Sequence, residues 1–328
     1  MAHSFFKSVI SAVPPLPLPP RHSALLLPVI TVLVIVLALS WGTQDLGAMA
    51  SEVMWRLRLP RVLLAVFTGA SLALAGLLLQ DFFRNPLVEP GLLGVSAGAG
   101  LAAVLVIAMG ASGLWALPLA AFAGALGALA LVLVTGRRLG AGNAELLLVG
   151  VALNALAAAL INLLLSLGDN TTLRSASFWL MGSFAQASWS LLLPSSVVLL
   201  LTILRSWQHS TALDVWQLGE SEAAHLGLDI QRFRREILIL ASVLVALAVA
   251  QSGGIGFIGL LAPHMARRLG FIRHRQLLPA SLLLGALLAV LADWLARILM
   301  APLELPVGVL TSLIGAPAFL LLFLRRRP

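Results

Sequence analysis

The sequence predicts an all-α membrane protein, a polytopic bundle of about ten transmembrane helices. Of its 328 residues, 60% are hydrophobic and only 10% are charged, and the mean hydropathy is +1.03. Soluble domains carry about 25% charged residues, so this chain has too little polar surface to face water alone. Its apolar runs are long and lack an alternation of period two. Helices are therefore the elements that satisfy the backbone hydrogen bonds inside lipid.

The apolar runs predict ten spans. They lie at about 24–40, 62–80, 92–110, 114–135, 145–167, 191–204, 237–251, 255–267, 278–299 and 307–324. The runs at 191–204, 237–251 and 255–267 are shorter than the ~20 residues that a straight span needs. Their boundaries are the least defined, and a tilted or partly re-entrant course is an alternative for each.

The distribution of Lys and Arg predicts the orientation. An even number of spans places both termini on one side. With the termini in the cytoplasm, all but five of the 21 Lys and Arg fall inside; the five outside are Arg56, Arg58, Arg61, Arg174 and Arg297. The positive-inside rule therefore predicts cytoplasmic termini. Residues 1–23, with the run PPLPLPP, read as a stiff Pro-rich cytoplasmic tail, and residues 24–328 read as a single transmembrane domain.

Only one predicted loop, residues 205–236, is long enough to dock a partner. We expect two short helices there, at about 212–218 and 221–226, lying at the membrane face. Thr211 and Asp214 have the spacing of a capping box at the first helix. Gly219 and Gly227 are suitable terminators for the two helices.

Gly254, Gly256 and Gly259 spell G-x-G-x-x-G, the pattern of a dinucleotide-binding loop. Such a site needs a preceding strand and an acidic residue about 20 positions later, and this context offers neither. The simpler interpretation is a break between two spans. The sequence also contains no G-x-x-x-x-G-K-[ST] motif, so we expect no ATP site in this chain.

Two further residues have alternative interpretations. One interpretation of His264 is functional, as a metal or haem ligand or a proton carrier. The other is a structural residue at a helix bend beside Pro263. Cysteine is absent from the sequence and no second His lies at helical spacing from His264, so we expect no metal and no cofactor. Asp293 lies deep in a predicted span. It either carries protons or pairs with Arg297 at i+4.

The five outer arginines run against the positive-inside rule. Either their stems reach up to lipid headgroups, or they form a basic rim that receives an acidic partner or an anionic substrate. In a membrane protein, a surplus of Arg such as the net charge of +8 reflects the orientation of the chain in the membrane. We therefore do not expect nucleic acid as a partner.

Four ordered stretches carry more specific motifs: residues 57–100, which begin LRLPRVLL; LGESEAAHLGLD at 218–229; GGIGFIGLLAPHMARRLG at 253–270; and residues 292–326, which begin ADWLARIL. Together they resemble the permease subunits of ABC importers for iron-siderophore complexes, haem and vitamin B12. The resemblance extends from about residue 57 to the C-terminus.

The resemblance implies a type II importer in the bacterial inner membrane. In that family, a homodimer of the ten-span permease encloses the channel, two separate ATPase subunits bind from the cytoplasm, and a periplasmic binding protein delivers the substrate. The permease itself would be no enzyme, because ATP hydrolysis resides in its partner.

The resemblance also implies roles for individual residues. The residues matching the family's coupling helix are Glu220, Glu222, Ala223, His225 and Gly227, within about 212–228. Those matching its rim for the binding protein are Arg58, Arg61 and Arg297. The motifs AAHLG and FWLMGSFAQASW look closer to haem permeases, which favours haem over a ferric siderophore as cargo. Arg174 is then a candidate contact for the haem propionates. The rival hypothesis is a proton-coupled secondary transporter that uses Asp293.

Overall fold

The structure is a computed structural model, and it describes residues 20–40, 50–111, 113–138, 143–301 and 303–324. Every regular element within these ranges is helical. The elements are α2 (Pro20–Ser40), α3 (Ala50–Val53), the π-helix η1 (Met54–Arg58), α4 (Leu59–Phe82), the 3-10 helix η2 (Pro90–Leu93), α5 (Val95–Ala108), α6 (Ala116–Arg138), α7 (Asn143–Leu167), α8 (Asn170–Leu180), α9 (Trp189–Gln208), α10 (Ser210–Trp216), α11 (Glu220–His225), α12 (Ile230–Ser252), α13 (Ile258–Arg268), α14 (His274–Ile298) and α15 (Val307–Leu324).

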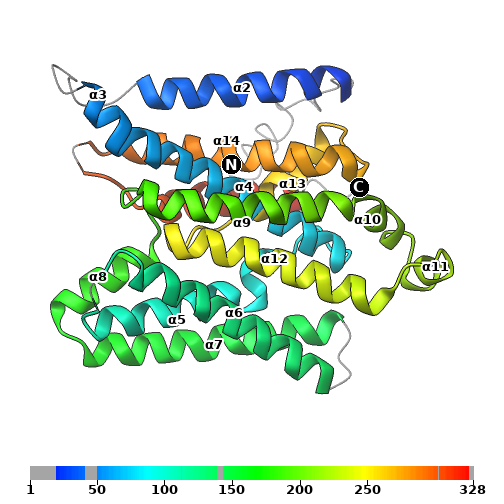
Figure 1. The fold of residues 1–328 in the computed structure, drawn as a ribbon, viewed down its shortest axis with the longest axis horizontal. Helices are drawn as coiled ribbons and strands as arrows, with labels where there is room; N and C mark the ends of the chain where they lie inside the picture. Colours follow the sequence, from blue (N-terminus) through cyan, green and yellow to red (C-terminus); the bar gives the residue numbers. More distant parts are fainter. Residues whose placement is uncertain (1–19, 41–49, 112, 139–142, 302, 325–328) are drawn as a thin grey trace, which may run out of the picture.

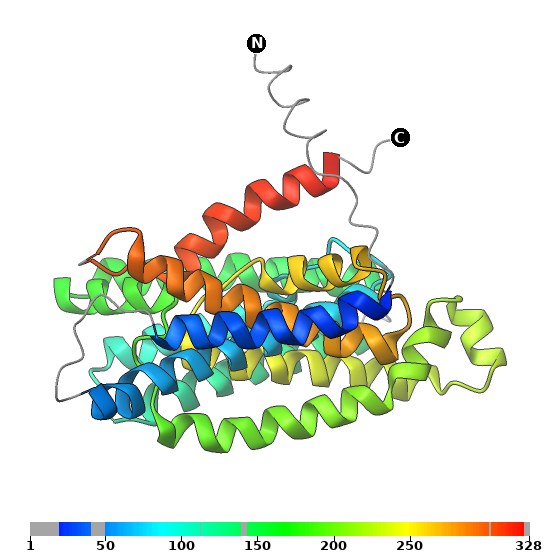
Figure 2. The ribbon, with the colours of Figure 1, turned by 90° about the horizontal axis from the view of Figure 1, so that it is seen from above.

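The helices run roughly along one axis of the bundle, with α10 and α11 at one end (Figure 1). We call this the coupling end. The opposite end, which carries α3, α8 and the described part of 299–306, we call the outer end. Helix α15 diverges from the other long helices, as Figure 2 shows.

Each of the ten predicted spans coincides with a helix. Five segments have the length and composition to cross a bilayer: Ser51–Phe82, Ala116–Gly136, Glu145–Leu167, Trp189–Gln208 and His274–Ile298. Three shorter helical segments, Leu25–Ser40, Val95–Ala108 and Val307–Leu321, are also apolar. With 11 residues, α13 extends only about 16 Å and cannot cross alone. The total of ten crossings therefore stays a prediction.

Helix α4 forms the centre of the bundle, and nearly all of its residues are buried. It packs against α12, α13 and α14. Small residues allow these close approaches: a side chain at Gly69 would collide with the carbonyl of Gly285 on α14, and one at Gly76 would collide with that of Gly259 on α13. By contrast, α6 and α7 expose large apolar side chains such as Leu131 and Leu148. Such surfaces suit lipid.

The predicted helices of the 205–236 loop are present as α10 and α11. The predicted capping box is wrong. Helix α10 begins at Ser210 after His209, which makes no side-chain cap, and Asp214 is bound instead by His274. Gly227, with φ of 86°, follows the end of α11 as predicted. Gly219 lies three residues beyond the end of α10 and is the N-cap residue of α11, where its φ of 131° and ψ of 154° suit a residue without a side chain.

The G-x-G-x-x-G segment separates α12 from α13, as the simpler interpretation predicted. A helix, not a strand, precedes it. Its loop packs tightly: a side chain at Gly254 would lie 2.5 Å from the carbonyl oxygen of Leu180. Phe257, the last residue before α13, has φ of 66°, a strained value for a residue with a side chain.

The N-terminal tail was predicted for residues 1–23. Helix α2 begins at Pro20, four residues earlier than the predicted span. Residues 1–19 lie outside the described residues, as do 325–328. Among the described helices, α2 begins and α15 ends toward the coupling end (Figures 1 and 2).

Candidate functional site

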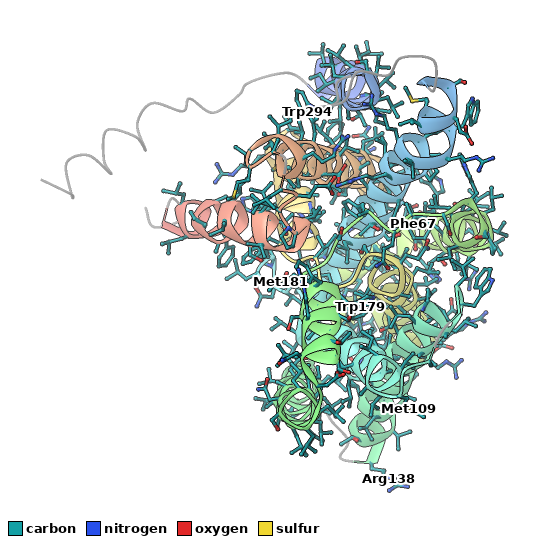
Figure 3. The ribbon with its side chains drawn as sticks, turned by 90° about the vertical axis from the view of Figure 1, so that its left-hand side faces the viewer. Phe67, Met109, Arg138, Trp179, Met181 and Trp294 are labelled. Carbon is teal, nitrogen blue, oxygen red and sulfur yellow. The ribbon has the colours of Figure 1, made fainter. Side chains whose placement is uncertain are left out.

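The outer end contains a cavity of about 550 Å³. Its lining comes from α5, α6, α8, α12 and the segments that precede α9 and α15. The lining residues are Ile107, Leu117, Arg174, Ser175, Phe178, Trp179, Ser183, Ala185, Gln186, Gln251, Ser252, Glu304, Leu305 and Pro306. Figure 3 looks onto this end, with Trp179 and Met181 near the middle of the view.

The cavity combines apolar walls with a few polar groups. Arg174 is exposed, and its guanidinium carbon lies 5.8 Å from the ring centroid of Phe178. Gln251 presents a buried Nε2 with no hydrogen-bond partner within the described part of the chain. A buried amide without a partner is costly, so it is a donor available to a ligand. The lining also includes the carboxylate of Glu304, whose charge is paired with Arg61. The exposed guanidinium of Arg174 and the unpaired Nε2 of Gln251 are therefore the donors that this cavity offers to an amphipathic anion.

Helix α8, which positions Arg174, was not predicted as a helix. Asp169 caps it by accepting a hydrogen bond of 2.8 Å from the backbone N–H of Thr172, and this bond lowers the pKa of Asp169. The Asp-Asn-Thr-Thr sequence is the start signal that could have revealed it.

Asp293, only 1% exposed, lies among arginines at the outer end. Its Oδ1 accepts from Nε of Arg61 at 2.9 Å, and its Oδ2 lies 3.2 Å from Nε of Arg297, an ion pair without hydrogen-bond geometry. The predicted pair with Arg297 is thus present, and Arg61 joins it.

The three predicted docking arginines cluster around the end of α2. Arg58 donates to the carbonyl of Leu39 and Arg297 to that of Ala38, each over 3.3 Å. These carbonyls lie at the C-terminus of α2, where cations are favoured. The side chains are largely buried, with Arg61 and Arg297 at 13% exposure. Apart from the pair of Arg297 with Asp293, the bonds of these arginines inside the protein were not predicted.

The predicted coupling residues lie on and beside α11, at the coupling end. Glu220, Glu222, His225 and Gly227 are exposed, whereas Ala223 is buried and anchors the helix to the core. The exposed side chains of Leu218 and Leu226 flank α11. Exposed apolar side chains rimmed by polar residues are typical of a protein interaction site.

Glu236 ties α12 to α9 near the coupling end. It precedes the predicted span 237–251. Its carboxylate contacts Arg232 on its own helix, Arg205 on α9, and His209 just after α9. The hydrogen bond from Arg232, with those from Arg205 and His209, outweighs burial and lowers the pKa of Glu236 to about 2.

His264 lies in α13, which contains Pro263, and its Nε2 accepts from Nε of Arg268 at 3.2 Å. Within the described residues, no group of three or more His, Asp or Glu side chains is placed to hold a metal ion. The sequence analysis missed a second polar cluster, made of Asp81, Asp214, Arg267 and His274, which we call the His274 cluster. Its members come from four different elements.

Comparisons with known proteins agree with this architecture. Residues 24–325 match the FecCD transport family. The chain is 43% identical over 324 residues to the hemin transport system permease protein HmuU of Yersinia pestis, covering 92% of this chain and 96% of that one. It is 40% identical over 284 residues to the vitamin B12 import system permease protein BtuC of Salmonella typhi, covering 85% and 86%.

A solved structure of a metal-chelate type ABC transporter in an inward-facing conformation has the same fold. It matches with a TM-score of 0.86 and 37% identity, over 92% of this chain and 99% of that one. The fold is that of a transport permease of the ABC importer type. The chain belongs to the FecCD transport family.

Proposed function

We propose that this chain is the inner-membrane permease of an ATP-driven importer that moves haem from the periplasm to the cytoplasm. Two copies enclose the path at their interface and alternate between outward- and inward-facing states. Two ATPase subunits bind the coupling end, and a periplasmic binding protein docks on the outer end.

The observation that carries this proposal is the placement of two different sites at opposite ends of one bundle. The cavity with Arg174 lies at the outer end, and the exposed face of α11 lies at the coupling end. A permease needs this division, because substrate arrives on one side and nucleotide-driven force is applied on the other.

Haem as the cargo is supported by the cavity and by the hemin permease relative. Haem is a flat apolar ring with two carboxylates. Trp179 and Phe178 offer apolar contacts, and Arg174 offers a guanidinium for a propionate. A ferric siderophore is the second candidate, and the relatives that import vitamin B12 supply the third.

For docking, we propose that Arg58, Arg61 and Arg297 receive carboxylates of the binding protein. Arg61 and Arg297 are partly exposed, so incoming carboxylates would compete with Asp293 for both arginines and with Glu304 for Arg61.

The rival, a proton-coupled transporter, needs Asp293 to gain and lose a proton. Its carboxylate lies instead between two arginines, in ion pairs with Arg61 and Arg297. The ion pairs therefore favour a structural role for Asp293.

The deciding experiment reconstitutes the permease in liposomes with its ATPase subunits and binding protein. We expect ATP-dependent uptake of haem. Uptake of only a ferric siderophore or only vitamin B12 would refute haem as the cargo, while the protein would still be the permease of an ABC importer. Uptake by the isolated chain under a pH gradient, abolished by Asp293→Asn, would establish the rival instead.

A further inference from the structure

His274 is the first residue of α14 and is 3% exposed. Both nitrogens of its ring face carboxylates from other elements. Nε2 lies 2.7 Å from Oδ2 of Asp81, near the end of α4, and Nδ1 lies 2.6 Å from Oδ1 of Asp214 on α10. The backbone N–H of His274 also donates to Oδ1 of Asp214 at 3.1 Å. The side chain thus bridges α4 and α10.

The geometry decides the protonation of this ring. Ionised carboxylate oxygens only accept hydrogen bonds, and a neutral imidazole carries one N–H and one lone pair. A neutral ring would therefore aim its lone pair at an oxygen of one carboxylate. An imidazolium donates to both. Two short contacts to two carboxylates assign the charged form to His274.

Arg267 completes the charge balance. Its Nη2 donates to Oδ1 of Asp81 at 2.8 Å, and its Nη1 donates to Oε1 of Gln80 at 2.6 Å. Gln80 in turn donates to the carbonyls of Gly259 and Leu260 on α13. Two cations thus match two carboxylates in a largely buried cluster, which limits the cost of removing those charges from water.

A second set of contacts ties α10 to the end of α4. Nε1 of Trp216 donates to the carbonyl of Phe82 at 3.1 Å, and the rings of these two residues stack with centroids 6.2 Å apart. Nε2 of Gln217 donates to the carbonyl of Asp81 at 3.3 Å. The guanidinium carbon of Arg84 lies 4.6 Å from the centroid of the Trp216 ring. Helix α10 is therefore held at the end of α4 by side chains along its length.

We propose that His274 is a positioning residue that locks α10 to the ends of α4, α13 and α14, so that these four elements move as one unit. The inference rests on the proposed importer function. When the ATPase subunits displace the α10–α11 segment, the lock passes the displacement to α4 at the centre of the bundle. Without the lock, the same displacement bends the loop, and ATP is hydrolysed with less transport.

The first test measures the lock itself. The sequence contains no cysteine, so spin labels can be placed by Thr211→Cys on α10 and Ile272→Cys between α13 and α14, both exposed positions. A doubly labelled copy, diluted with unlabelled copies, is measured in the complex with the ATPase subunits, with and without ATP and vanadate. We expect one narrow distance in both states.

In His274→Gln, we expect the distance distribution to broaden or to shift between the nucleotide states. An unchanged narrow distribution in that variant would overturn the proposal. This measurement needs no transported substrate, so it stands even if the cargo is not haem.

The second test measures coupling as haem moved per ATP hydrolysed in liposomes. We expect a fall of several-fold in His274→Gln, with the ATPase subunits still bound. Arg275→Gln is the matched control, because it removes an exposed cation one residue away, and it should keep the wild-type ratio.

If the His274→Gln variant does not assemble with the ATPase subunits, Asp214→Asn weakens the same His274–Asp214 contact by a change on α10. Its side chain is 43% exposed, so the substitution disturbs the core less. A wild-type ratio in an assembled variant of either residue refutes the lock. Failure of the wild-type complex to couple ATP hydrolysis to any uptake refutes the proposed function instead, and the label distances then decide whether the lock exists.

Discussion

Arg61 binds Asp293 and Glu304 at the same time. Its Nε donates to Oδ1 of buried Asp293, and its Nη1 lies 3.1 and 2.9 Å from the two carboxylate oxygens of Glu304. Glu304 is also a lining residue of the outer cavity. One guanidinium thus connects the centre of the arginine cluster with the rim of the cavity. We therefore expect docking at the arginines to change the position of Glu304 in the cavity wall.

The two carboxylates that share Arg61 should differ strongly in their contribution to stability. Asp293→Asn leaves largely buried Arg297 without its counter-charge and Arg61 with Glu304 alone, so we expect a loss of roughly 3 kcal/mol or more. Glu304→Gln, at a side chain that is half exposed, should cost less than about 1 kcal/mol. Thermal unfolding of the two variants in the same detergent gives the comparison. Equal melting temperatures would contradict the assigned difference.

Arg174 should contribute to cargo affinity and not to assembly. Replacing it with Ala removes the charged donor for a carboxylate, a loss of about 1.5–3 kcal/mol, which corresponds to about 10- to 150-fold weaker half-saturation for haem uptake. Arg174→Lys, which keeps the charge and loses the planar fork, should fall between Ala and the wild type. Uptake at varied haem concentration checks this order. A wild-type uptake curve for Arg174→Ala would show that Arg174 does not contribute to binding of the cargo.

The exposed face of α11 should bind the ATPase subunits. Glu222→Arg reverses a charge on this face, so we expect the ATPase subunits to be lost during copurification with the permease. Glu52→Arg makes the same change at an exposed position of α3, at the outer end, and should retain them. Retention by both variants would exclude this face as the docking surface.

The close approach of α4 and α13 at Gly76 should tolerate no side chain. Gly76→Ala places a methyl group against the carbonyl of Gly259, so we expect a loss of about 1–3 kcal/mol from overpacking. Gly127→Ala is the matched control, since a methyl group there meets nothing within 4 Å. It should be neutral or stabilising by roughly 0.5–1 kcal/mol, because glycine is unfavourable inside a helix. Melting temperatures of the two variants test the packing.

Glu236 should contribute stability that acid removes. Its pKa falls from an ordinary value of 4.5 to about 2 in the folded protein. A lowered carboxyl pKa stabilises the fold above the unfolded value, and this contribution disappears as the pH falls from 4.5 toward 2. The difference in melting temperature between the wild type and Glu236→Gln should therefore be constant near neutral pH and shrink below pH 4.5. A constant difference down to pH 2.5 would contradict the assignment.

The hydrophobic pattern was sufficient to place the ten main helices, because each is an apolar run bounded by polar or turn residues. It missed α8, whose sequence NTTLRSASFWL has no long apolar run. Helix boundaries at α10 were wrong for a different reason. Thr211 and Asp214 have capping spacing, but His274 binds the Asp214 carboxylate from 60 residues away, and local pattern contains no information about such a partner.

The candidate sites divide in the same way. Asp293 could be found from its position in an apolar run, and Arg297 from its i+4 spacing. The contact of Asp293 with Arg61 spans 232 positions, and that of His274 with Asp81 spans 193. His274 looked like one more residue of a basic loop, because only the packing of α4 against α14 brings it to Asp81.

The position of α2 has a consequence for the order in which the protein is made. This helix is synthesised early, yet it packs mainly against α14, and Arg297 on α14 binds the carbonyl of Ala38 near its C-terminus. At about 5–20 residues per second, the roughly 230 residues between the two helices take on the order of 10–50 s to translate. During that time α2 lies in the lipid without its main neighbour. Its own apolar sequence must therefore hold it in the membrane until the end of translation.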